Sequence, residues 1–400
     1  MDETAFERAK ALFFEGNECF AAGRFAAAEE RFEAALALVP GRASTLANLG
    51  AARVRGGRPR EALPVLAQAL ALEPDDLQSI GHQAMALAAL GRHAEALASF
   101  DRVLAAEPEH VASWLGRGEA LRFLERHDEA LAAFERANAL APTLAVAWTQ
   151  RGSILRDRGQ IDAARHAFEQ AIAHGGDPEL NGYFLAALTG GNAPAQAPVG
   201  YVRRFFDEYA PSFDAHLVTT LVYRAPAMLV EQIVALGPRR FASALDLGCG
   251  TGLCGPLLRP LCDRLEGVDL SERMLGQAAM RGVYDALTKA ELVAHLASSE
   301  ERHDLLVAAD VFIYIGALAP VFEGAAHVLG RDGLFAFTAE ACADEARDVV
   351  LLPSLRYAHS EEHLRALAAE HGFAIASLVR APLRKEQGND VEGLYVVLRH

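Results

Sequence analysis

Two patterns of apolar and polar positions divide the chain. Over roughly residues 9–178, small and large apolar residues recur at helical spacing, and from residue 241 short apolar runs alternate with helical stretches. The first pattern predicts amphipathic helices, because residues three and four apart share a helix face. The second is typical of a parallel sheet covered by helices. We therefore expect an all-α region followed by an α/β domain.

The first region repeats every 34 residues. Prolines mark the period, and small residues recur in phase with them, which indicates helix pairs that approach closely. The recurring residues are Pro40, Pro74, Pro108 and Pro142, then Gly16, Gly50, Gly118 and Gly152 in first helices, and Ala28, Ala62, Ala96, Ala130 and Ala164 in second helices. Four residues after these alanines stand Phe32, Leu66, Phe100, Phe134 and Phe168. We expect these side chains to pack between helices.

These positions resemble the tetratricopeptide repeat. The resemblance implies an all-α solenoid of about five repeats over residues 1–178, whose concave face is a possible docking surface for a protein partner. The segment 179–190 predicts a capping helix for the last repeat, and residues 191–200 (GNAPAQAPVG) predict a short linker. The remaining domain would then span residues 201–400.

A glycine-rich segment opens the second domain. In FASALDLGCGTG a strand is expected to end at Asp246, and Gly248, Gly250 and Gly252 follow at alternate positions before a helix that opens at Leu253. Glycines allow a ligand to approach the backbone closely, and a helix N-terminus favours negative charge. The segment therefore predicts a cofactor site.

An acidic residue strengthens this prediction. Asp269 stands 17 residues past Gly252, at the end of a second expected strand in LEGVDLS, where a carboxylate can accept hydrogen bonds from ribose hydroxyls. A dehydrogenase is the alternative, but a nicotinamide or flavin fingerprint would place its third glycine at position 253, which is Leu253.

The segments DLGCGTG, GVDLS and VAADVFIYI resemble motifs I, II and IV of class I S-adenosylmethionine-dependent methyltransferases. The resemblance implies an α/β Rossmann-like domain with a seven-stranded mixed sheet in the order 3-2-1-4-5-7-6, its last strand antiparallel. We expect strands near 244–247, 265–269, 285–288, 304–309, 333–339, 373–379 and 392–398.

The same resemblance implies a set of residues that bind S-adenosyl-L-methionine. They are Gly248, Cys249, Gly250 and Gly252 at the methionine moiety, Asp246 at its ammonium, Asp269 at the ribose, Leu270 and Met274 at the adenine face, Glu291 and Leu292 around the adenine, and Asp310. For Glu291, a purely structural role stays open as the alternative. The helix within 201–217 adds Tyr209 and Phe213, which would close over the cofactor, although simple packing explains them equally well.

Three residues are catalytic candidates: Asp310, Tyr314 and His359. Asp310 ends the fourth strand, where the acceptor would meet the methyl group, and it orients the acceptor or caps the loop. His359 is either a general base or acceptor-orienting group, or a residue that hydrogen-bonds within a loop. The segment ADVFIY lacks the [DN]PP[YF] tetrapeptide, which disfavours methylation of bases or glutamine. The segments RYAHS (356–360) and LRKEQG (383–388) resemble a bacterial family of predicted repeat-containing methyltransferases that joins these two modules in this order, and that family implies no particular acceptor.

A zinc-peptidase pattern, H-x-x-E-H, spans His359 to His363. Ser360 is a natural N-cap, so the first histidine would lie outside the helix that carries the second, and the two could not share a face. We expect no metal site.

Composition bears on the partners and on the cellular compartment of the protein. The 400 residues carry a formal charge of −15 with no basic run, which disfavours nucleic acid as a partner. Five cysteines without a CxxC pair fit a reducing cytoplasm. The start, MDETAFERAK, is unlike an export signal, and no stretch of 18 residues is continuously apolar, so we expect a cytoplasmic protein without a membrane span.

Three functions stay open: methylation of a small molecule, methylation of a protein or peptide docked on the repeats, and a non-catalytic scaffold that binds the cofactor. The helix at 201–217 favours a small-molecule acceptor. The solenoid favours a polypeptide, because extended concave surfaces generally bind polypeptide segments.

Overall fold

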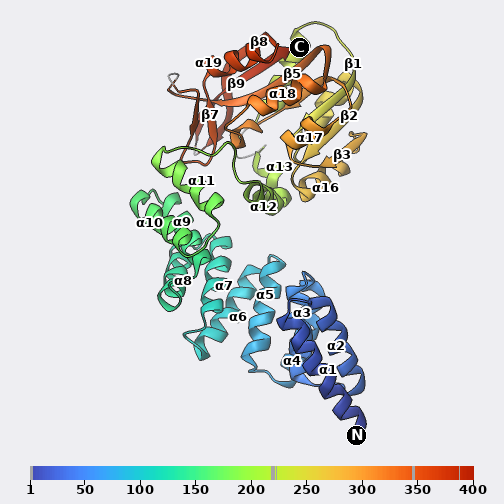
Figure 1. Ribbon diagram of the computed structural model, residues 1–400, viewed down its shortest axis with the longest axis vertical. Coiled ribbons are helices and arrows are strands. Elements are labelled where there is room, and N and C mark those ends of the chain that lie inside the picture. The colour runs from blue at the N-terminus through green and yellow to red at the C-terminus, as the bar shows by residue number, and fades with distance from the viewer. Residues whose placement is uncertain (1–2, 218–220, 222, 345–346, 387) are drawn as a thin grey trace. The chain divides into compact units, whose positions relative to one another are not determined.

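The computed structural model describes residues 3–217, 221, 223–344, 347–386 and 388–400 (Figure 1). The chain divides into two compact units, which meet in the sequence between Asp177 and Pro178. Each unit is described by itself below.

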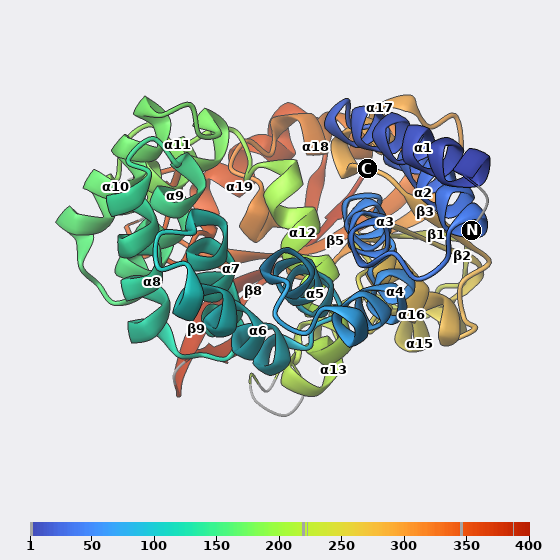
Figure 2. The same cartoon turned by 90° about the horizontal axis from the view of Figure 1, so that it is seen from below.

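The first unit consists of helix pairs. Each helix contacts the next one along the chain, and Figure 2 shows the successive pairs following one another from α1 to α10. The helices are α1 (Glu3–Ala21), α2 (Phe25–Leu38), α3 (Ala43–Arg55), α4 (Pro59–Leu72), α5 (Leu77–Ala89), α6 (His93–Ala106), α7 (Val111–Phe123), α8 (His127–Leu140), α9 (Ala145–Asp157) and α10 (Ile161–Ala173). The described residues of this unit thus form ten helices in five consecutive pairs, the arrangement that the 34-residue period predicts.

Steric contact between a glycine and a large side chain sets the spacing within a pair. A Cβ atom added to Gly118 in α7 would lie 2.6 Å from the ring of Phe134 in α8, and Gly152 meets Phe168 at the same distance. The α5–α6 pair departs from this pattern, because Ala84 holds the equivalent position. There the ring of Phe100 instead lies against Gly116 of the following helix. The helices approach each other so closely at these positions that only small residues fit there.

We predict that Gly118→Ala lowers the free energy of unfolding by about 1–3 kcal/mol, because the added methyl group would overpack the Phe134 ring. Gly81→Ala is the matched control, since a Cβ at that helical position meets no atom within 4 Å. It should raise stability by about 0.5–1 kcal/mol. Urea unfolding followed by circular dichroism measures both, and equal stability of the two variants would contradict the packing argument.

The second unit contains a nine-stranded sheet in the described residues. Its main strands are β1 (Phe241–Leu247), β2 (Cys262–Asp269), β3 (Ala286–Lys289), β4 (His303–Ala308), β5 (Leu329–Ala341), β8 (Ala374–Glu386) and β9 (Asn389–Arg399). They pair in the order β3-β2-β1-β4-β5-β9-β8, with β1 to β5 parallel and β9 antiparallel to both neighbours. Counted as seven strands this is 3-2-1-4-5-7-6, as expected.

Two short strands were not expected. They are β6 (Val349–Leu351) and β7 (Tyr357–His359), and β7 pairs with the last residues of β5, Glu340 and Ala341. Strands of three residues are too short to show an alternating pattern.

Helices cover both faces of the sheet. Along β5, Phe335 and Phe337 pack on one face with α17 (Leu292–Ser298), α18 (Ala319–Val328) and α19 (Glu361–Glu370). The alternate residues Leu334 and Ala336 pack on the other face with α14 (Ala225–Ala235) and α15 (Gly255–Leu258). Because successive side chains of a strand point to opposite faces, each face of the sheet has its own hydrophobic core. Among the described residues, no helix is long and apolar enough to cross a membrane.

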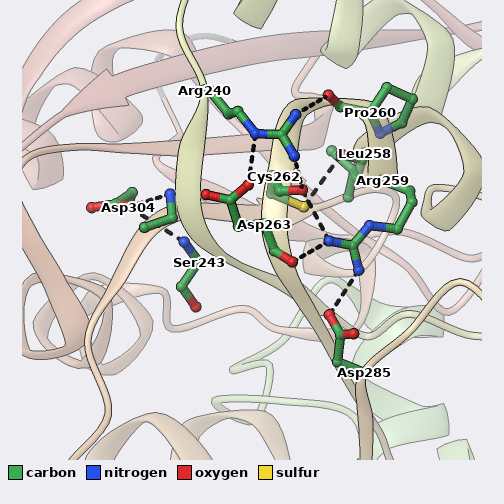
Figure 3. A network of polar contacts seen from close by, with 10 residues as sticks. Arg240, Ser243, Leu258, Arg259, Pro260, Cys262, Asp263, Asp285 and Asp304 are labelled. Atoms are coloured by element: carbon green, nitrogen blue, oxygen red, sulfur yellow. Dashed lines mark hydrogen bonds and ion pairs between the residues drawn. The ribbon is translucent and has the colours of Figure 1, made fainter.

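Polar contacts hold the edge where β1 and β2 begin (Figure 3). Arg240 pairs with Asp263 at 2.6 Å, Arg259 pairs with Asp285 at 2.7 Å, and one oxygen of Asp304 accepts hydrogen bonds from the backbone at the start of β1. This edge lies opposite the glycine-rich loop, which follows the other end of β1. The network therefore serves strand alignment rather than the cofactor site.

The segment for which a capping helix and a short linker are expected belongs to the second unit. Helix α11 (Pro178–Thr189) buries Tyr183 against the second unit, where its hydroxyl donates to the carbonyl of Leu355. The residues that follow it pair with the loop after β4: Ala197 N–H donates to Tyr314 O at 2.9 Å, and Gly316 N–H donates to Ala195 O at 2.8 Å. We call residues 194–198 the strap. Backbone pairing and aromatic burial make α11 and the strap parts of the second unit.

We predict that a 178–400 fragment is more stable than a 195–400 fragment by at least about 3 kcal/mol, because the shorter one loses Tyr183 and its buried neighbours. Thermal unfolding of both fragments measures the difference. Equal melting temperatures would show that α11 contributes nothing to the fold of this unit.

Candidate active site

The glycine-rich loop after β1 has a conformation that only glycine adopts easily. Gly248, Gly250 and Gly252 have φ values of 65°, 55° and 83°. A Cβ on Gly248 would lie 2.6 Å from Val311, and one on Gly252 would lie 2.9 Å from Tyr284. Gly250 differs, because the nearest atom to its added Cβ would be in Phe213, 3.9 Å away. Gly250 thus leaves an open space beside the backbone of the loop, the open cradle, which a side chain at this position would fill.

The helix after this loop is shorter than expected. We expected it to open at Leu253 and to favour negative charge, but α15 has only four residues and is followed by a 3₁₀ turn, η3 (Arg259–Leu261). Pro256 starts the short helix, and Pro260 prevents its continuation, because proline cannot donate the next helical hydrogen bond. Backbone N–H groups of the loop, rather than a helix dipole, are the available donors.

Two carboxylates flank the loop. Asp269, at the end of β2, accepts from Gly250 N–H at 2.9 Å and from Ser271 N–H at 2.8 Å, and each of its oxygens keeps further acceptor capacity. Asp246, at the end of β1, is 1% exposed and accepts from the Tyr284 hydroxyl at 2.6 Å. Burial raises the pKa of Asp246 to about 7, and it also raises the pKa of Asp269. Sequence reasoning missed Tyr284, which belongs to no motif.

The other residues expected at the cofactor lie nearby but differ in exposure. Cys249 is buried, and its sulfur lies where a Cβ on Gly267 would be only 2.9 Å away. Leu270 is partly exposed, whereas Met274 is 0% exposed and Leu292 only 7% exposed. Glu291 caps α17, accepting from Val293 N–H and Ala294 N–H. This contact is the structural role that the sequence left open.

A segment before β1 lies against the loop. The helix expected within 201–217 is broken into α12 (Val199–Tyr209), a 3₁₀ turn η1 (Ala210–Ser212) and α13 (Phe213–Ala215), with Pro211 at the break. Asp207 accepts from the Ser271 hydroxyl at 2.6 Å, and Asp214 accepts from Thr251 and pairs with Arg281. These contacts, absent from the sequence motifs, attach the segment to the loop and to α16 (Glu272–Met280).

Aromatic rings link this segment to the loop after β4. Tyr209 contacts Phe213 edge-on at 5.1 Å between ring centroids, and Phe206 contacts Tyr314 at 5.4 Å. Phe213 is also the side chain that faces Gly250. The structure therefore brings Tyr209, Phe213 and Tyr314 to one region beside the glycine-rich loop.

The three catalytic candidates have different surroundings. Asp310 has a φ of 60° and lies next to Val311, which contacts Gly248. Burial raises the pKa of Tyr314 to about 12, so its hydroxyl stays protonated at neutral pH. His359 is fully buried, and its Nε2 lies 3.0 Å from the carbonyl of Ile315, to which it must donate.

These contacts are those of a histidine that holds the 312–315 loop. Burial lowers the pKa of His359 to about 4, and its Nδ1 is buried without a hydrogen-bond partner in the part of the chain that the structure describes. The structure therefore places Asp310 and Tyr314 after β4, near the glycine-rich loop, and buries His359 against residues 312–315. Ser360 caps α19 as expected, accepting from His363 N–H.

One group of side chains could in principle hold a metal ion. Ligand atoms of Glu266, Glu301 and His303 lie within 4.8 Å of one another, but Arg264 pairs with both carboxylates, at 2.6 and 3.4 Å. The group also lies toward the edge where β4 begins, away from the glycine-rich loop. We assign no metal to it.

Comparisons with known proteins agree with this geometry. Residues 245–337, which include the glycine-rich loop, Asp269, Asp310 and Tyr314, match the methyltransferase domain family. Residues 20–86, 82–145 and 145–173 match tetratricopeptide repeat families.

Two curated relatives share part of the chain. Methyltransferase-like protein 27 of Homo sapiens is 38% identical over 118 residues, which are 29% of this chain and 46% of that protein. Nodulation protein S of Bradyrhizobium diazoefficiens is 33% identical over 75 residues, 18% of this chain and 36% of that protein. The chain thus spans less than half the length of either relative.

Solved structures also align. Magnesium protoporphyrin IX methyltransferase from Synechocystis PCC 6803, solved with bound SAH, is 18% identical with a TM-score of 0.40, and the alignment covers 50% of this chain and 99% of that one. PilF of Pseudomonas aeruginosa is 19% identical with a TM-score of 0.42, covering 46% and 85%. From its sheet order and its domain matches, the chain joins tetratricopeptide repeats at residues 20–173 to a class I S-adenosylmethionine-dependent methyltransferase domain.

Proposed function

We propose that this chain transfers a methyl group from S-adenosylmethionine to a small-molecule acceptor. The observation that carries the proposal is the glycine-rich loop, in which Gly250 faces an open cradle while Asp269 holds its N–H. When bound, the cofactor supplies a methyl group on a positively charged sulfur. The protein has to bind it, align an acceptor with it and exclude water.

The residues around the loop are suited to the parts of the cofactor. Backbone groups of residues 248–252 would bind the methionine moiety, Asp246 its ammonium, and Asp269 the ribose hydroxyls, since carboxylates accept hydrogen bonds from both groups. Leu270 would contact the adenine. Tyr209 and Phe213 would cover the bound cofactor and exclude water.

On the acceptor side we assign roles to Asp310 and Tyr314. Asp310 supplies a carboxylate at the end of β4, and Tyr314 supplies a protonated hydroxyl that can donate a hydrogen bond. His359 is assigned to holding residues 312–315 in place, because its Nε2 already donates to Ile315. Little acid or base catalysis is required, because alignment provides most of the rate in a displacement of this kind.

Calorimetric titration with S-adenosylhomocysteine tests the proposal. We expect micromolar affinity, roughly −8 kcal/mol, and at least a tenfold loss in Asp269→Ala. Asp263→Ala is the matched control, because Asp263 lies at the other end of the same strand with a side chain 62% exposed. Folded wild-type protein that binds neither S-adenosylhomocysteine nor S-adenosylmethionine would refute the proposal.

Cofactor affinity should depend on pH through Asp246. Only the ionised carboxylate attracts an ammonium, and burial raises the pKa of Asp246 to about 7. Affinity for S-adenosylhomocysteine should therefore be constant above about pH 8 and fall below pH 7, approaching tenfold per pH unit. The hydroxyl of Tyr284 lowers this pKa, so Tyr284→Phe should move the transition to higher pH. A flat affinity between pH 6 and 8 would contradict the role of Asp246.

A polypeptide acceptor is the second candidate, and the repeats at residues 20–173 favour it. The 178–400 fragment separates the two cases. A small-molecule methyltransferase would keep its activity in the fragment, whereas an enzyme that recruits its substrate through the solenoid would lose it. Cofactor binding without turnover on any acceptor would instead indicate a scaffold.

A further inference from the structure

A fully buried arginine, Arg384, contacts Asp310 just after the end of β4. The side chain of Arg384 is 1% exposed and contacts three carboxylates. Its Nη1 donates to both oxygens of Asp310, at 3.0 and 3.2 Å, its Nη2 donates to Glu340 at 2.6 Å, and its Nε donates to Glu386 at 2.7 Å. Every nitrogen of the guanidinium is thus engaged, and because the side chain is 1% exposed it is not accessible to an anionic substrate.

A bulge in β8 directs this side chain inward. The register between β8 and β9 shifts between Pro382 and Arg384. Leu383 packs so closely against Gly393 that a Cβ there would lie 2.2 Å from it, and both Leu383 and Arg384 are buried. In a regular strand successive side chains point to opposite faces, and bulges are known to redirect side chains beside active sites.

Asp310 is held in a strained conformation. Its φ of 60° is uncommon for a residue with a side chain, and such strain persists only where the surroundings impose it. Thr338 accepts from the backbone N–H of Asp310 at 2.8 Å, and Arg384 holds the carboxylate. Asp310 directly precedes Val311, whose side chain contacts Gly248 of the glycine-rich loop.

The charges of the cluster do not cancel. Arg384 and Arg356, which also pairs with Glu386, oppose the three carboxylates of Asp310, Glu340 and Glu386. One negative charge is left over when all five groups are ionised. Buried ion pairs are often no more stable than apolar residues of the same size, so stability alone gives weak reason for such a cluster.

We propose that Arg384 is a positioning residue that fixes Asp310 to accept a hydrogen bond from the methyl acceptor, which is therefore an amine or a hydroxyl compound without negative charge. This inference rests on the proposed function. It extends that function by naming the chemical class of the acceptor and a residue that acts through Asp310.

The test uses sinefungin, a cofactor analogue in which a carbon bearing an amine replaces the methylated sulfur. Its amine stands where the methyl group would be presented to the acceptor, so a fixed Asp310 carboxylate should bind it, whereas S-adenosylhomocysteine has no such group. Calorimetry gives the affinity for both ligands. In Asp310→Asn we expect sinefungin affinity to fall about tenfold and S-adenosylhomocysteine affinity to change less than twofold, in keeping with one charged hydrogen bond.

Arg384→Gln should produce the same selective loss, and Arg384→Lys should recover part of it, because lysine keeps the charge but lacks the planar fork. The double variant Asp310→Asn/Arg384→Gln should lose no more than Asp310→Asn alone, because a residue that acts through another is not additive with it. Arg380→Met, on the same strand, is the control and should leave both affinities unchanged. If Arg384→Gln does not fold, the lysine variant and its own double variant with Asp310→Asn carry the test.

The outcomes separate the two claims. Folded wild-type protein that binds neither S-adenosylhomocysteine nor S-adenosylmethionine refutes the proposed function. Normal S-adenosylhomocysteine binding with an unchanged sinefungin affinity in both Arg384 variants, or with additive losses in the double variant, overturns the role of Arg384.

Discussion

The backbone of residues 248–252 is the constraint on which the methyltransferase unit depends. Side chains of Val311 and Tyr284 approach Gly248 and Gly252 so closely that any Cβ there would collide with them. Asp269 holds the N–H of Gly250 from the neighbouring strand. One loop therefore joins the ends of β1 and β2 to the turn after β4, and it keeps one open side. Every residue that we assign to the cofactor or the acceptor is placed relative to it.

Buried charge is the second feature of this site. Asp246 and Arg384 are removed from water, and removing charges from water is costly unless each one is paired. Tyr284 partly compensates Asp246, and Arg384 compensates three carboxylates at once. The same burial raises the pKa of Asp246 and of Tyr314 and lowers that of His359. Burial therefore moves the pKa values of these three groups away from their usual values.

Close packing also explains the boundary between the two units. Close contact between a glycine and a large apolar side chain recurs in four of the five helix pairs of the solenoid, and the last of these contacts, between Gly152 and Phe168, lies in the α9–α10 pair. Tyr183 of α11 then bonds to the carbonyl of Leu355, and the strap pairs with the backbone of the loop that carries Tyr314. A segment that the sequence places between domains is thus part of the second unit.

The sequence by itself determined the features that depend on local rules. The 34-residue period predicted the helix pairs, alternating glycines predicted a tight ligand loop, and Ser360 predicted a helix start, because each depends on residues near one another in the chain. Tertiary structure alone decided what depends on distant partners. Arg384 reaches Asp310 across 74 positions and Tyr183 reaches Leu355 across 172, and no local pattern encodes such pairs. His359 shows the same limit, because its residue type suits catalysis while its burial behind residues 312–315 gives it a different part in the fold.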